Sequence, residues 1–151
     1  MQFRDLHKQY LSLQPEMNQA IEGILNSGIF IGGSHVKELE QELADYVNAK
    51  HCISCANGTD ALQLALMAWE VGVGDAVIVP DFTFFSSGEV VSAVGATPIF
   101  IDVNRSTFNL HTGQIEEACK LAKANGLNPK VLVAVDLFGQ PADYDAIKSC
   151  C

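Results

Sequence analysis

The spacing of apolar residues changes near residue 51. Before that point, residues 14–26 and 35–47 carry their apolar side chains at helical spacing, which predicts two helices. Pro15 suits the first turn of the earlier helix, and Gly28 lies just past its end. After residue 51, short continuous apolar runs alternate with longer amphipathic runs, which predicts strands that alternate with helices.

Four apolar runs predict strands: HCISCA (51–56), AVIVP (76–80), PIFIDV (98–103) and KVLVAVDLF (130–138). Continuously apolar strands rich in Val and Ile are typical of parallel sheets that are covered on both faces. Helices are predicted after these runs, over residues 58–70, 83–95, 112–124 and from about 142. Gly72 is expected to end the first of these helices, and Thr112 is a candidate N-cap. The sequence therefore predicts an α/β fold, in three α/β/α layers around a mostly parallel sheet.

The composition of the chain favours a globular protein and argues against nucleic-acid-binding and membrane-spanning proteins. The 151 residues are 48% hydrophobic and 18% charged, a balance that supports a globular core. The formal net charge is −9 and no basic stripe is present, which argues against a nucleic-acid partner. The apolar runs are too short to span a membrane. The odd number of cysteines and the lack of a signal peptide predict a cytoplasmic protein.

The cysteines and histidines do not predict a metal site. Cys52 and Cys55 have C-x-x-C spacing, but no second pair follows, and they would face opposite sides of a strand. We therefore expect thiols in a buried strand. The four histidines show no metal-ligand spacing.

Ligands of open α/β sheets bind beyond the carboxyl ends of the strands. Four segments are expected at that edge: residues 56–60, 80–87, 102–105 and 136–140. Asp102 in the third segment and Asp136 in the fourth could bind a ligand or cap the turns that follow.

The segment CANGTDAL (55–62) leads from a predicted strand directly into a predicted helix. The first amides of a helix lack intrahelical partners, and the helix dipole favours an anion there. Gly58 would let a ligand approach the backbone, and the Thr59 hydroxyl could donate to an oxyanion, as in a phosphate site. The alternative is an ordinary helix start, with Asn57 or Thr59 as the N-cap and Asp60 in the first turn.

The segment PDFTFFSSG (80–88) places three phenylalanines at the same edge. Phe84 could stack on a flat cofactor ring, or could belong to the core. In the amino-terminal part, the glycine-rich loop SGIFIGGS holds Phe30 and Ile31. Loops usually hide such apolar side chains or use them on a partner.

Taken together, six segments resemble the DegT/DnrJ/EryC1/StrS sugar aminotransferase family. They occur in the family's order: FRDLHKQY, SGIFIGGSHVKELE, CANGTDAL, VIVPDFTFFSS, GATPIFIDV and DLFGQPADYDAI. The resemblance extends over essentially the whole chain. It implies the aspartate-aminotransferase fold (fold type I), pyridoxal 5'-phosphate (PLP) as cofactor, and transfer of an amino group from glutamate to a nucleotide-linked keto-sugar.

The resemblance also implies roles for particular residues. Gly58, Thr59 and Asp60 would hold the cofactor phosphate, and Phe84 would stack on the pyridine ring. The loop around Phe30 and Ile31 would border the nucleotide-sugar site of a homodimer. CANGTDALQ is most similar to the branch that aminates carbon 3, which includes enzymes acting on UDP-linked 3-keto sugars.

The family's aldimine lysine and pyridine-binding aspartate come later than DLFGQPADYDAI, so both are expected beyond residue 151. We therefore expect an amino-terminal fragment that is inactive alone and does not retain the cofactor. Residues 1–50 would form the amino-terminal helices and the substrate-bordering loop, and residues 51–151 a partial PLP-binding domain. Alternatives are a sugar dehydratase of the same family, or a non-catalytic binding or dimerisation remnant.

Overall fold

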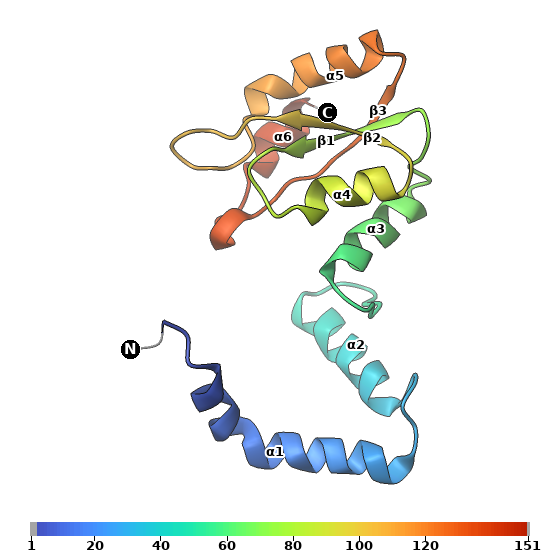
Figure 1. Cartoon of the computed structure of the whole chain (residues 1–151), viewed down its shortest axis with the longest axis vertical. Helices are drawn as coiled ribbons and strands as arrows, with labels where there is room; N and C mark the ends of the chain where they lie inside the picture. Colours follow the sequence, from blue (N-terminus) through green and yellow to red (C-terminus); the bar gives the residue numbers. More distant parts are fainter. Residues whose placement is uncertain (1–2, 151) are drawn as a thin grey trace. The chain divides into compact units, whose positions relative to one another are not determined.

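The computed structural model describes residues 3–150 (Figure 1). The chain forms two compact units, which divide between Ser54 and Cys55.

The amino-terminal unit contains two helices, α1 (Leu6–Ser27) and α2 (Ser34–Tyr46). The Asp5 carboxylate caps α1 by accepting a hydrogen bond from the Lys8 amide at 2.9 Å. Gly28 ends α1 in a left-handed conformation with φ of 68°, which confirms the predicted end of this helix. The predicted place of Pro15 in the first turn is wrong, because the Asp5 cap starts the helix nine residues earlier, at Leu6.

Few apolar side chains of this unit are covered. Of its described hydrophobic residues, Ala44 alone is buried. The carboxylate of Glu40 in α2 accepts hydrogen bonds from both the amide and the hydroxyl of Ser54, at 2.8 Å each. These two bonds hold the pKa of Glu40 below its usual value, the backbone bond having the larger effect.

The second unit is built on a parallel sheet of three strands in the order β2-β1-β3. The strands are β1 (Asp75–Pro80), β2 (Thr97–Ile101) and β3 (Asn128–Leu132). The central strand β1 pairs in parallel with both neighbours, for example through Ile78 with Ile99 and with Leu132. The predicted parallel sheet is therefore confirmed.

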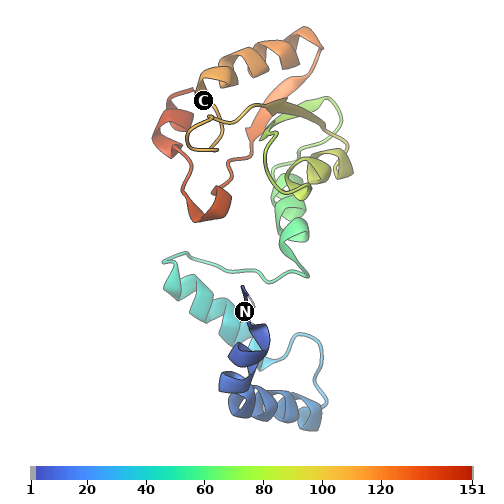
Figure 2. The same cartoon turned by 60° about the vertical axis from the view of Figure 1, so that its left-hand side comes forward.

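Helices pack on both faces of this sheet (Figure 2). They are α3 (Gly58–Ala68), α4 (Ser86–Ala93), α5 (Ile115–Ala124) and α6 (Tyr144–Cys150), with short 3-10 segments η1 (Thr112–Gln114) and η2 (Leu137–Gly139). On one face, Val77 and Val79 pack with buried residues of α3 and α4. On the other face, Ile78 packs with residues of α5 and α6. Alternate residues of β1 thus face opposite cores, and the predicted α/β/α layering is confirmed.

The strand predicted over residues 51–56 is absent. Residues 51–55 have no regular secondary structure, Cys55 is exposed, and Ile53 is 83% exposed. A strand exists only through hydrogen bonds to a neighbouring strand, and in the described part of the chain none pairs with this segment. The sheet therefore has three strands instead of four, and the expectation of thiols in a buried strand is wrong.

Other element ends also differ from the predictions. Helix α3 ends at Ala68, before Gly72, because Glu70 adopts a left-handed conformation with φ of 55°. Thr112 is not an N-cap, since it lies within η1, and Gln114 precedes α5. Strand β3 ends at Leu132, six residues before the predicted end at 138.

Candidate functional site

Asn57 is the N-cap of α3. Its side-chain oxygen accepts a hydrogen bond from the Asp60 amide at 2.9 Å, and its side-chain nitrogen donates to the Asp60 carboxylate at 3.2 Å. The backbone of Asn57 is extended, with φ of −164° and ψ of 176°, as the N-cap position requires. The cap alternative therefore holds for Asn57, and the Asp60 carboxylate is directed to Asn57.

The cap leaves donors at the start of α3 without partners in the described part of the chain. Among the described residues, no acceptor pairs with the amides of Gly58 and Thr59 or with the Thr59 hydroxyl. The helix dipole adds about half a positive charge at this end. The Asp60 amide is committed to Asn57, so the donors that remain for an anion belong to Gly58 and Thr59.

The space beside Gly58 is open. A Cβ atom at this position would have no heavy atom within 4 Å, apart from its chain neighbours and the backbone of α3 itself. Two amides and a hydroxyl without partners among the described residues, at a helix start with open space beside Gly58, match the requirements of a phosphate group. The residues present therefore fit the phosphate of PLP, and the N-cap does not exclude a phosphate at this helix start.

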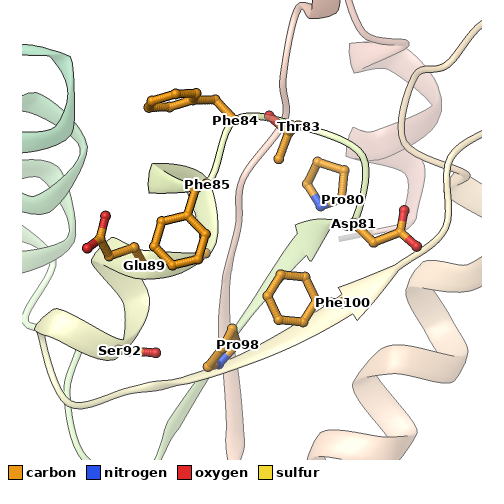
Figure 3. A pocket seen from close by; sticks show the side chains of 10 residues that line it. Pro80, Asp81, Thr83, Phe84, Phe85, Glu89, Ser92, Pro98 and Phe100 are labelled. Atoms are coloured by element: carbon orange, nitrogen blue, oxygen red, sulfur yellow. The ribbon is translucent and has the colours of Figure 1, made fainter.

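The second edge segment, residues 80–87, begins at the last residue of β1 and borders a cavity of about 350 Å³ (Figure 3). Phe85, Phe100 and Pro98 line this cavity together with Thr83 and Phe84. The lining does not include Gly58, Thr59 or Asp60.

The three phenylalanines of this segment have different surroundings. Phe84 is 74% exposed, so the core alternative is wrong for this residue. In Figure 3 its ring points away from Phe85 and Phe100. The Phe82 ring packs against Phe108, with ring centroids 5.6 Å apart. Phe85 is also exposed, at 76%, so Phe84 and Phe85 both offer a ring to a ligand, and only the family resemblance singles out Phe84.

The two edge aspartates both support turns. The Asp102 carboxylate accepts a hydrogen bond from the Val103 amide at 2.7 Å. The Asp136 carboxylate accepts from the Ala142 amide and from the Tyr144 hydroxyl, both at 2.9 Å. The bond to Asp136 raises the pKa of Tyr144 above its usual value. These contacts match the turn-capping alternative for both carboxylates.

Phe30 and Ile31 are exposed in the loop between α1 and α2, at 68% and 94%. Ile31 is followed by Gly32 in a left-handed conformation with φ of 65°. The roles predicted for these two side chains stay predictions.

Two residues that sequence reasoning missed lie in the loop after β2. Asn109 is buried, and its side-chain nitrogen donates to the Pro141 carbonyl at 2.7 Å. Phe108 contacts Phe82. Neither contact has a local sequence signal, because Asn109 and Pro141 are 32 residues apart and the chain between Phe82 and Phe108 includes a complete helix and strand.

The lysines do not follow the carboxyl ends of the strands. They lie in helices, in the loop after α2 and in β3, at positions 8, 37, 50, 120, 123, 130 and 148. Lys130 is held by the Glu70 carbonyl at 2.7 Å and by the Asp75 carboxylate at 3.1 Å. Within residues 3–150, no group of three or more His, Cys, Asp or Glu side chains could hold a metal ion, and no helix has the length and hydropathy of a membrane span.

Comparison with known proteins identifies the family of this chain. The profile of the DegT/DnrJ/EryC1/StrS aminotransferase family matches residues 12–151. The UDP-2-acetamido-2-deoxy-3-oxo-D-glucuronate aminotransferase of Pseudomonas aeruginosa is 42% identical over 99% of this chain and 40% of its own length.

Solved structures agree with this match. A DegT DnrJ EryC1 StrS aminotransferase from Brucella abortus superposes with a TM-score of 0.93 at 43% identity, over 99% of this chain and 40% of that chain. DesV of S. venezuelae, in complex with a ketimine intermediate, superposes with a TM-score of 0.88 at 36% identity. The match covers 99% of this chain and 38% of that chain. The chain thus spans about 40% of the length of these relatives. It belongs to the DegT/DnrJ/EryC1/StrS aminotransferase family.

Proposed function

We propose that this chain supplies the phosphate-binding and ring-stacking part of a PLP-dependent aminotransferase. The full-length gene product would move an amino group from glutamate to a nucleotide-linked keto-sugar. The observation that carries this proposal is the start of α3, where the amides of Gly58 and Thr59 and the Thr59 hydroxyl have no partner within residues 3–150 and Gly58 has open space beside it. Family membership supports the reaction class.

The residues of the chain have binding and orienting roles in this proposal. Gly58 and Thr59 hold the phosphate, and Asn57 keeps the Asp60 carboxylate directed to itself, away from the anion. Phe84 offers an exposed ring for stacking on the pyridine. PLP, when bound, supplies the electron sink that amino-group transfer needs.

The substrate we propose is a UDP-linked 3-keto sugar. The support is the 42% identical relative, which is named as an aminotransferase of UDP-2-acetamido-2-deoxy-3-oxo-D-glucuronate. Phe30 and Ile31 would border this substrate, since both are exposed apolar side chains on a glycine-rich loop. We further propose that the enzyme acts in the cytoplasm, which cell fractionation would test.

The experiment that tests the function is a single-turnover assay on the full-length gene product loaded with PLP. Glutamate should convert the cofactor to its amino form, and a UDP-linked 3-keto sugar should return the original absorbance spectrum. A full-length product that binds PLP but does not react with glutamate would contradict the aminotransferase proposal. Dehydration of the sugar instead would identify a dehydratase.

The 151-residue chain by itself is proposed to be inactive and not to retain PLP. The support is the placement of its seven lysines, none of which follows the carboxyl end of a strand. Borohydride treatment of the chain with PLP should therefore give no specific adduct, whereas the full-length product should give one. Specific modification of one lysine in the chain alone would refute this expectation.

We also propose that the amino-terminal unit packs against a second copy of the chain in a homodimer. The support is the number of its large apolar side chains that are exposed, among them Leu25, Phe30 and Tyr46. Large exposed apolar side chains in this number are typical of a surface that packs against a partner. Sedimentation of the full-length product at several concentrations tests the proposal, and a monomer at all concentrations would contradict it.

A further inference from the structure

The loop between β2 and α5, residues 104–110, has a closed backbone. Val103 and Leu110 form an antiparallel bridge across its base. Inside the loop, the Phe108 amide donates to the Asn104 carbonyl at 2.7 Å. The backbone of the loop is therefore fixed by its own hydrogen bonds.

A buried side chain anchors this loop to another segment. Asn109 is 8% exposed, and its side-chain nitrogen donates to the carbonyl of Pro141. Pro141 is followed by Ala142, whose amide is bound by the Asp136 carboxylate. The loop is thus attached both at its base and to the segment that follows β3.

Phe108 stands in this anchored loop with an unfavourable backbone. Its φ is 60°, in the left-handed region that residues with large side chains rarely adopt. Such a conformation persists where surrounding contacts determine it, and it often occurs at functional positions. Phe108 makes an aromatic contact with Phe82, with ring planes inclined at 41°.

Phe82 belongs to the segment that carries Phe84. This segment is held at its start by the Asp81 amide, which donates to the Ile101 carbonyl at 2.9 Å, and at its end by the Ser87 amide, which donates to the Phe84 carbonyl at 3.1 Å. Between these two bonds, the Phe82 ring contacts Phe108 in the loop after β2. The Thr83 and Ser87 hydroxyls, 3.2 Å apart, also hold this segment, and the contact of Phe82 with Phe108 adds to these bonds in fixing the backbone that carries Phe84.

We propose that Phe108 is a positioning residue for the cofactor site. It acts through Phe82: the anchored β2–α5 loop holds the Phe108 ring, this ring restrains Phe82, and Phe82 together with the hydrogen bonds at Thr83 and Phe84 positions the Phe84 ring. The inference rests on the proposed function, since Phe84 is the residue proposed to stack on the PLP ring.

The test is a double-mutant cycle in the full-length gene product, with Phe108→Gly and Phe82→Leu. Phe108→Gly removes the ring but relieves the left-handed backbone, so the unfolding midpoint of the cofactor-free protein should change little. Each single variant should raise the dissociation constant of PLP roughly two- to ten-fold, the range expected for one aromatic pair. The double variant should bind no more weakly than the weaker single variant.

The matched backbone control is Glu70→Gly. Glu70 also has a left-handed backbone, with φ of 55°, and its side chain is exposed. This variant should bind PLP as the wild type does. Amide hydrogen exchange at residues 81 and 87 of the cofactor-free protein should accelerate in Phe108→Gly and not in the control.

The outcomes separate the two proposals. If the wild type binds PLP and Phe108→Gly binds it equally well, the positioning role is refuted and the proposed function stands. Additive effects of the two substitutions, or unchanged exchange at residues 81 and 87, also refute the positioning role. If the wild type does not bind PLP, the proposed function fails, and the positioning role fails with it.

Discussion

Replacing Gly58 with alanine should separate the stability of α3 from the affinity of its phosphate site. The added methyl group would meet no atom of the protein, and glycine is a weaker helix former than alanine. Gly58→Ala should therefore raise the free energy of unfolding by about 0.5 kcal/mol. The same methyl group would occupy the space through which a phosphate approaches the Gly58 and Thr59 amides.

The expected loss of PLP affinity follows from the hydrogen bonds that the Gly58 and Thr59 amides would donate to the phosphate. A hydrogen bond to a charged group contributes about 1.5–3 kcal/mol, so loss of one bond corresponds to a roughly 10- to 150-fold higher dissociation constant for PLP. The assay is equilibrium titration of the full-length product with PLP, beside urea unfolding of the cofactor-free protein. Gly23→Ala in α1 is the matched control, because a Cβ atom there also meets nothing within 4 Å.

Gly23→Ala should raise stability, by about 0.5–1 kcal/mol, and leave PLP affinity unchanged. A Gly58→Ala variant that binds PLP with wild-type affinity would refute the phosphate role of Gly58. A Gly58→Ala variant that unfolds more easily than the wild type would contradict the open space beside Gly58.

Three further predictions concern the fold. Asn57→Ala removes the α3 cap and should lower the free energy of unfolding by about 1 kcal/mol, whereas Asn57→Ser should restore most of it, as measured by urea unfolding. Ile115 is fully buried beneath the sheet, so Ile115→Ala should cost about 2–5 kcal/mol and Ile115→Val about 0.5–1.5 kcal/mol in the same assay; equal effects would contradict close packing there. The Asn128 side chain donates to Asp75 and is the main cause that lowers the pKa of this carboxyl. Ionised Asp75 therefore adds stability above its unfolded pKa of about 3.9, which is lost as the pH falls through the lower folded value. The thermal midpoint of Asp75→Asn should approach that of the wild type below that pH, and a constant difference at all pH values would contradict the assignment.

The central sheet could be predicted from the sequence because the pattern of apolar residues in its strands follows directly from their burial. Val77 and Val79 face one core and Ile78 the other, so an uninterrupted apolar run is what a strand covered on both faces requires. The start of α3 could be predicted for a similar reason, since Asn57 and Gly58 are local signals for a cap and for close approach.

Other features depend on contacts that a local pattern does not contain. Residues 51–56 are apolar enough for a strand, but a strand needs a neighbour, and composition does not say whether one is present. The contact of Phe82 with Phe108 and the bond of Asn109 to Pro141 join loops that are distant in sequence. The exposed ring of Phe84 likewise depends on how the segment after β1 turns, which the alternation of apolar residues leaves open.

The most direct test of the phosphate site is the preference for PLP over pyridoxal, which lacks the phosphate. The dissociation constants of both compounds would be measured for the full-length product and for Thr59→Val, which keeps the shape of the side chain but removes its hydroxyl. The wild type should prefer PLP by at least roughly 100-fold, and Thr59→Val should reduce this preference roughly ten-fold. Equal affinity of the wild type for the two compounds, or an unchanged preference in Thr59→Val, would contradict a phosphate site at the start of α3.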